Sequence, residues 1–194
     1  MPPLPHDAEP MELETARLRL DALRAEDAVA LFTYRGDPAV SRYQGWRPAA
    51  QADAERFIGS QSAMAAPVPC QWFQRAIRNR EDGALIGDVG FCVADAQAEF
   101  GITLAPAAQG HGYARETLHA LFDWLFGRLD VHRVYASVDP RNAPSMALLQ
   151  AMGMCKEAHF RESLRFHGEW VDDVVFGLLA SEWPGKGARI AAPR

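Results

Sequence analysis

The residues from Gln109 to Ala114 form a glycine-rich turn between a predicted strand and a predicted helix. Gly110 and Gly112 lack a Cβ atom, so backbone N–H groups of this turn can approach a ligand closely. The following helix adds unpaired N–H groups and the positive end of its dipole. Such a place favours an anion, and a pyrophosphate group fits it. The turn therefore predicts a phosphate-binding site.

The surrounding residues exclude two common phosphate motifs. No Gly-Lys-Ser/Thr follows the turn, as a nucleotide-binding P-loop requires. The dinucleotide-binding pattern needs Gly or Ala at the position that Arg115 occupies. A turn of this kind alone is more often a plain loop than a ligand site. Its meaning therefore depends on the elements around it.

The elements before the turn follow from the spacing of apolar residues. The chain opens with a strand at 16–23 and then shows helical spacing over 25–35 and 51–64. Three consecutive antiparallel strands are the simplest account of the next segments, with turns where Gly, Asn and Asp gather. These strands cover residues 71–77, 84–94 and 99–106.

The elements after the turn alternate between helix and strand. A 3.6-residue apolar period over 115–126 predicts a long helix packed on a sheet. A strand at 133–139 leads to a short helix that begins after Asn142, a favourable N-cap residue, and stops near Gly153. Two last strands cover residues 155–164 and 170–179.

Length and composition indicate one ordinary globular domain. The 194 residues are 48% hydrophobic and 23% charged, and we expect a domain at 11–183 with flexible tails at 1–10 and 184–194. The net charge of −5 argues against a nucleic-acid partner. No leader-like or membrane-length apolar run occurs, which predicts a cytoplasmic protein without a membrane partner. The His and Cys residues lack metal-ligand spacing, so no metal is expected.

Together these segments resemble the GNAT superfamily of N-acetyltransferases. Gln109 to Ala114 is similar to its Gln/Arg-x-x-Gly-x-Gly/Ala motif, between a strand and a helix. Residues 13–32 resemble its opening strand and helix, 133–154 its Asn-x-x-Ser element and 166–183 its closing hairpin. The likeness is greatest to the branch of ribosomal-protein N-terminal (Rim-type) acetyltransferases.

The resemblance implies a mixed α/β fold with a mostly antiparallel central sheet of about seven strands, splayed in the middle, and about four flanking helices. It implies transfer of acetyl from acetyl-CoA to an amine by direct attack in a ternary complex. The backbone of Ile102, Thr103 and Leu104 is expected to pair with the pantetheine arm as another strand would. The pyrophosphate is expected at Gln109, Gly110, His111, Gly112, Tyr113 and Ala114.

Two residues of the Asn-x-x-Ser element receive roles from the resemblance. Asn142 is expected beside the cofactor arm, and Ser145 near the sulfur, where its hydroxyl would protonate the departing thiolate. A structural explanation exists for both, since Asn142 is also a good N-cap and Ser145 falls in the first turn of the helix.

The attacking amine must be neutral, and a free alkylamine of pKa about 10 is mostly protonated at neutral pH. Glu99 matches a position where several GNAT enzymes keep a catalytic Glu, and it is the expected base; a solvated strand-end carboxylate is the alternative. Rim-type relatives often keep a Glu where this chain has Leu164. Glu162 would share that strand face and is the second candidate.

The acceptor is expected to be a protein N-terminus or a small-molecule amine, and the acidic balance leaves open a basic peptide or a polyamine. Tyr43 and Trp46 lie where this family shapes the acceptor cleft, although aromatic residues are often core. A homodimer through the closing strands is a further expectation. An acyl-CoA-binding sensor without turnover is the alternative function, motivated by Leu164, and a nucleotide-binding protein is a third.

Overall fold

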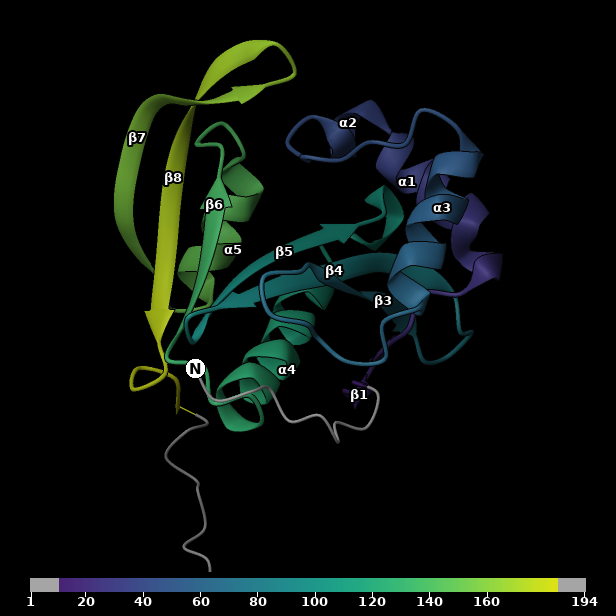
Figure 1. Cartoon of the computed structure of the whole chain (residues 1–194), viewed down its shortest axis with the longest axis horizontal. Helices are drawn as coiled ribbons and strands as arrows, with labels where there is room; N and C mark the ends of the chain where they lie inside the picture. Colours follow the sequence, from purple (N-terminus) through teal and green to yellow (C-terminus); the bar gives the residue numbers. More distant parts are fainter. Residues whose placement is uncertain (1–10, 185–194) are drawn as a thin grey trace, which may run out of the picture.

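The computed structural model describes residues 11–184, which form a single mixed sheet with helices on both faces (Figure 1). In this part of the chain the sheet has eight strands in the order β1-β2-β3-β4-β5-β6-β8-β7. The predicted α/β class with a mostly antiparallel sheet is confirmed. The tail predicted at 1–10, and that at 184–194 beyond its first residue, lie outside the described residues.

The first five strands form an antiparallel half-sheet. They are β1 (Leu13–Glu14), β2 (Leu18–Asp21), β3 (Phe73–Asn79), β4 (Leu85–Ala94) and β5 (Gln97–Leu104). The tight connection between β4 and β5 uses Asp95 and Ala96 at φ 47° and 60°. A two-residue turn of this hand matches the twist of the strands it joins. The β4–β5 pairing runs unbroken from Gly87, opposite Leu104, to Ala94, opposite Gln97.

Helices cover the two faces of this half-sheet with separate cores. One face holds α1 (Ala28–Gly36) and α3 (Gln51–Ser62), with α2 (Pro38–Ser41) between them and the short η1 (Ala25–Asp27) ahead of α1. The other face holds α4 (Tyr113–Gly127), preceded by η2 (Pro106–Ala108), while α5 (Ala143–Ala151) packs into the same core beside the second half of the sheet (Figure 1). The predicted apolar stripe of α4 is fully buried. It comprises Leu118, Leu121, Phe122 and Leu125.

A buried ionic cluster ties α1 to the sheet. The Asp88 carboxylate on β4 is fully buried and accepts hydrogen bonds from the Tyr34 hydroxyl at 2.6 Å and from Arg35 Nε at 3.0 Å. Gln74 on β3 donates to the same carboxylate. Because a buried charge is costly unless it is paired, these partners fix the position of α1 over β4.

The second half of the sheet turns away from the first. It consists of β6 (Arg133–Val138), β7 (Cys155–Phe166) and β8 (Glu169–Leu179). β6 is parallel to β5, but the two strands pair only over Gln97–Glu99 and Arg133–Tyr135. Beyond these three pairs β6 and β8 diverge from β5, as Figure 1 shows. The predicted mid-sheet splay lies at this point.

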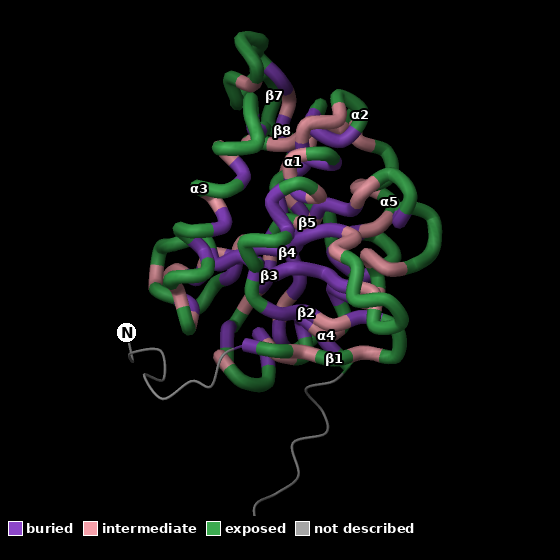
Figure 2. The backbone as a smooth tube through the Cα atoms, turned by 90° about the vertical axis from the view of Figure 1, so that its right-hand side faces the viewer, coloured by how far each residue is buried: buried purple, intermediate pink, exposed green. Residues whose placement is uncertain are grey.

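Burial differs among the strands of the sheet. Figure 2 shows the buried residues concentrated on β2 to β5, whereas β7, the edge strand of the sheet, is exposed along most of its length. None of the helices between residues 11 and 184 is long and apolar enough to cross a membrane.

Candidate active site

A cavity of about 340 Å³ opens where β5 and β6 separate. Its walls come from β5, β6 and α5, from the β7–β8 hairpin, and from the loop after α2. Five residues singled out from the sequence line it: Tyr43, Glu99, Ile102, Asn142 and Ser145. The fold thus gathers at one place residues that are far apart in the chain.

The edge of β5 that faces this cavity has free backbone groups. Within the described residues, no strand pairs with that edge beyond Glu99. At Gly101 an added Cβ would meet nothing within 4 Å, and Ile102 lines the cavity. Thr103 and Leu104 complete the strand, and the Thr103 hydroxyl donates to Gln44 Oε1 at 3.1 Å. An extended, amide-containing arm can therefore add to this edge as another strand would.

The glycine-rich turn begins α4 in the manner that the sequence predicts. Gly112 is the N-cap of α4 at φ 80°, and Gly110 has φ 78°, a region that glycine adopts without strain. Nothing lies within 4 Å of a Cβ added at Gly110. The Gln109 side chain donates to the Leu104 carbonyl at 3.1 Å and so ties the turn to the end of β5. Open N–H groups at a helix N-terminus suit a pyrophosphate.

The turn is also braced by Arg17, a residue that no sequence motif singles out. Arg17, just before β2, donates to the His111 carbonyl at 3.0 Å and forms an ion pair with Glu116 of α4 at 2.7 Å. Its guanidinium lies 4.5 Å from the centre of the Tyr113 ring, which stacks on the His111 ring. Because Arg17 and His111 are 94 positions apart, no local pattern signals this contact.

Glu99 lies at the point where the two strands part. Its partner Tyr135 is the last in the β5–β6 ladder, and the Tyr135 hydroxyl is 3.4 Å from Glu99 Oε2. Burial raises the pKa of the Glu99 carboxyl above its ordinary value, and repulsion by Asp173 adds to the rise, while the Tyr135 hydrogen bond opposes it. A half-buried carboxyl with a raised pKa is suited to proton transfer near neutral pH.

Asn142 and Ser145 come from the N-terminus of α5. The Asn142 side chain caps the helix by accepting from the Ser145 backbone N–H at 3.3 Å, so the predicted N-cap is confirmed. Both residues also line the cavity. Among the described residues, no hydrogen bond engages the Ser145 hydroxyl. That hydroxyl remains available to a ligand.

Comparison with known sequences decides what this arrangement belongs to. The family model of the acetyltransferase (GNAT) domain matches residues 17–155. The chain belongs to the GNAT acetyltransferase family. The resemblance to this family is thereby confirmed. The predicted enzyme class, an N-acetyltransferase with acetyl-CoA as its co-substrate, is confirmed with it.

Relatives and solved structures agree with the assignment. The uncharacterized N-acetyltransferase p20 of Bacillus licheniformis is 32% identical, covering 89% of this chain and 98% of the relative. The [ribosomal protein uS5]-alanine N-acetyltransferase of Escherichia coli is 31% identical over 87 residues, 44% of this chain and 45% of the relative. The predicted similarity to the ribosomal-protein acetyltransferases is thus confirmed.

Two solved structures share the fold. A GNAT-family acetyltransferase from Bacillus anthracis superposes with a TM-score of 0.80 at 22% identity, over 89% of this chain and 100% of that one. The spermidine N-acetyltransferase of Vibrio cholerae, solved with CoA and spermine, superposes with a TM-score of 0.73 at 23% identity, over 87% of this chain and 98% of that one.

The two carboxylates considered as base in this GNAT protein occupy different places. Leu164 lines the cavity, but Glu162 is not among the lining residues. The β7–β8 register shifts between Phe160 and Leu164, and Glu162 has φ 46°. This irregularity interrupts the alternation of side chains along β7, so residues two apart no longer share a face. The expectation that Glu162 stands on the face of Leu164 does not hold.

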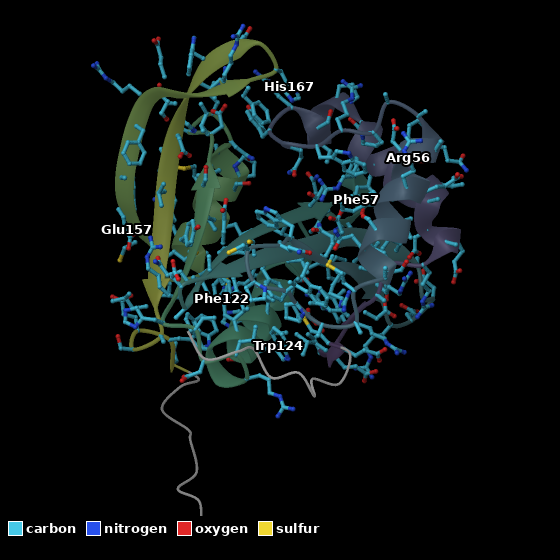
Figure 3. The ribbon with its side chains drawn as sticks, viewed as in Figure 1. Arg56, Phe57, Phe122, Trp124, Glu157 and His167 are labelled. Carbon is cyan, nitrogen blue, oxygen red and sulfur yellow. The ribbon has the colours of Figure 1, made fainter. Side chains whose placement is uncertain are left out.

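The two aromatic residues proposed for the acceptor cleft also separate. Tyr43 lines the cavity, and its hydroxyl donates to the Arg141 carbonyl at 3.2 Å, across the mouth between the α2 loop and the β6–α5 loop. Trp46 stacks on Phe57 of α3, with ring centres 4.4 Å apart, and does not line the cavity. Phe57 is labelled in Figure 3. Trp46 is thus partly buried against the core beneath α1 and α3, which agrees with the alternative of a packing role.

Several polar cavity residues were missed from the sequence. Tyr135, Ser137 and Asp139 line or face the splay from alternate positions of β6 and its end, and Asp172 contributes from β8. The signal was present, since polar residues two apart in an otherwise apolar strand mark a face that does not enter the core. The β6–β8 register that brings Asp173 to the Ser137 hydroxyl, 2.5 Å away, is not readable from the sequence.

Proposed function

We propose that this GNAT protein acetylates the primary amine of a protein N-terminus or a small molecule by direct attack on acetyl-CoA in a ternary complex. No covalent enzyme intermediate is needed. The observation that carries the proposal is the position of Glu99, whose half-buried carboxyl lines the cavity at the last β5–β6 pair. Groups that line the cavity around Glu99 can contact both the thioester of acetyl-CoA and the attacking amine.

The binding of acetyl-CoA is assigned to two surfaces that meet at the end of β5. The free edge of β5 at Ile102, Thr103 and Leu104 would take the pantetheine arm, with Asn142 across the cavity. The N–H groups of the turn at 109–114 would hold the pyrophosphate, since Gly110 and Gly112 keep it open. Acetyl-CoA supplies the thioester carbonyl that the amine attacks.

Proton transfer is assigned to Glu99. An alkylamine arrives mostly as an ammonium ion, and the carboxylates of Glu99 and Asp172 that line the cavity attract that cation. Ionised Glu99 then accepts a proton, directly or through water, and its raised pKa brings it closer to the working pH. Because Leu164 has no carboxylate, β7 supplies no base at its cavity position, and the role of base falls to Glu99 on β5.

Protonation of the leaving group is assigned to Ser145. Its hydroxyl is placed by the first turn of α5, which the Asn142 cap holds in position. Donation of a proton to the departing thiolate would stabilise the charge that develops on sulfur.

Two measurements test this function. Calorimetric titration with acetyl-CoA, and in parallel with ATP and NAD, is expected to show saturable binding of acetyl-CoA alone. A thiol-release assay with N-terminal peptides, amino acids and polyamines is expected to show turnover with an amine. Binding without turnover for every amine would favour the acyl-CoA sensor, and a stable acetyl group trapped on Cys70, Cys92 or Cys155 would contradict direct attack.

A further inference from the structure

A second pocket, of about 320 Å³, adjoins the active-site cavity. Phe166 lines both spaces. The walls of the second pocket come from α2 and the loop after it, from Arg141 ahead of α5, and from the β7–β8 turn. His167 of this turn, labelled in Figure 3, lies at the end of the hairpin that faces α2.

Positive charge predominates in this second pocket. Three guanidinium groups line it, those of Arg42, Arg47 and Arg141, against the single carboxylate of Glu169. Among the described residues, no hydrogen bond or ion pair engages the Arg47 guanidinium. The close partner of Arg42 is the Tyr43 ring, whose centre lies 5.3 Å from the guanidinium carbon. The positive charge of Arg42 also contributes to lowering the pKa of Asp139.

Arg141 is the guanidinium of the three that is already paired. Its Nε and Nη2 atoms donate to the Asp139 carboxylate, at 2.9 Å and 2.6 Å for the closest contacts. This pairing offsets the charges of Arg141 and Asp139, so the unpaired positive charge of the second pocket comes from Arg42 and Arg47. Asp139 lines the first cavity, with Glu99 and Asp172, while the unpaired Arg42 and Arg47 line the second pocket.

We propose that the acceptor carries a carboxylate, which Arg42 and Arg47 bind in the second pocket while its amine lies beside Glu99. The inference rests on the proposed function and narrows its substrate class. An acceptor with an amine at one end and an anionic group a few bonds away matches both the acidic cavity and the basic pocket. A polyamine matches the first and is repelled by the second, despite the net negative charge of the whole chain.

The chemistry of arginine supports a carboxylate as the anion. A guanidinium group presents planar, paired N–H donors that match the two oxygens of a carboxylate, and it loses less on partial desolvation than an ammonium group does. A single exposed charge pair gains little, but two guanidinium groups that line one pocket can bind the same carboxylate. The carboxylate can belong to an amino-acid-like small molecule or to an acidic residue that follows a peptide N-terminus.

The test compares acceptors that differ only in charge. The probes are glutamate against glutamine, amidated Ala-Asp-Glu against Ala-Asn-Gln peptides, and spermidine. In the thiol-release assay, the acid is expected to exceed its amide in kcat/KM by about tenfold or more in at least one pair, as for a charged hydrogen-bonded contact. The pair that shows the difference identifies the source of the carboxylate.

Variants tie this preference to the pocket. In Arg42→Gln/Arg47→Gln the acid-to-amide ratio is expected to fall toward one. Arg128→Gln is the matched control, because Arg128 is an exposed arginine at the end of α4, remote from the pocket. Equal rates for acid and amide, preference for spermidine, or a ratio that survives in the double variant would overturn the proposal.

A binding measurement separates this proposal from the function on which it rests. N-acetylglutamate and N-acetylglutamine are compared by saturation-transfer NMR on protein loaded with CoA. Preferential binding of the acid that the double variant loses supports the carboxylate pocket even where turnover is slow. Equal or absent binding of acid and amide, for this pair and for the acetylated, amidated Ala-Asp-Glu and Ala-Asn-Gln peptides, in protein that calorimetry shows to bind acetyl-CoA, overturns the pocket alone. Failure to bind acetyl-CoA overturns the proposed function itself.

Discussion

Tyr135 donates a hydrogen bond from its hydroxyl to Glu99 across the last pair of the β5–β6 ladder, at an oxygen–oxygen distance of 3.4 Å. Burial raises the pKa of the Tyr135 phenol, so it stays protonated and available as a donor at neutral pH. The residue that ends the strand pairing thus also limits the rise in the pKa of the proposed base. The splay and the acid–base chemistry are consequences of the same pair.

Tyr135→Phe is expected to move the acidic limb of the pH–rate profile to higher pH. The hydrogen bond from Tyr135 lowers the pKa of Glu99, whereas burial and Asp173 raise it. Without this hydrogen bond, nothing opposes the rise in the Glu99 pKa that burial and Asp173 cause. Since Glu99 accepts a proton only when ionised, activity is lost as the pH falls through its pKa. The profile of kcat/KM measures that limb, and an unchanged or lower midpoint would contradict the assignment.

Glu99→Gln is expected to leave the melting temperature at neutral pH unchanged or to raise it. The folded pKa of Glu99 lies above its unfolded value, so its stabilising contribution is full below the unfolded pKa and is lost as the pH rises through the folded pKa. At neutral pH the ionised group carries a desolvation penalty that glutamine lacks. Calorimetric melting measures the change, and a clear fall would show that the carboxylate has a structural role instead.

Gly112→Val is expected to abolish detectable binding of acetyl-CoA. A valine at φ 80° costs roughly 1–2 kcal/mol in backbone strain, and its side chain would stand in the turn proposed to hold the pyrophosphate. Gly83→Val is the matched control, since Gly83 has φ 73° and open space around it, in the β3–β4 turn and outside the turn at 109–114. Calorimetry should show binding retained in Gly83→Val. Equal loss in both variants would point to general destabilisation.

Asp88→Ala is expected to lower the free energy of unfolding by about 3–5 kcal/mol, the range for a buried charge left without its partner. The change strands the Arg35 guanidinium, which is itself buried. Glu81→Ala, at an exposed turn position, is expected to change stability by less than about 0.5 kcal/mol. Urea titration measures both. A small effect at Asp88 would mean that Arg35 finds water or another acceptor.

Much of the fold was readable from the sequence because its signals are local. The apolar stripe of α4, the paired strands β4 and β5 and the cap at Asn142 follow from periodicity and turn chemistry. The four-residue α2 was missed, since one turn of helix is too short to show a period.

The site was less predictable because it depends on register and long-range contacts. The shift in β7 that removes Glu162 from the face of Leu164 depends on how β7 pairs with β8. The stacking of Trp46 on Phe57 depends on where α3 packs. The second pocket joins residues 38–47 to residues 141–169, so its three arginines look unrelated in the sequence.

The central claim is that Glu99 is the base of an N-acetyltransferase whose cavity lies between the splayed strands. It is tested most directly by single-turnover kinetics of Glu99→Gln beside Glu162→Gln, each with its acetyl-CoA affinity measured. The account predicts that Glu99→Gln binds acetyl-CoA as the parent does but transfers acetyl about 100-fold more slowly or worse, a typical loss for a general base. Glu162→Gln should keep the parent rate. Full activity in Glu99→Gln, or the loss appearing in Glu162→Gln instead, would contradict the account.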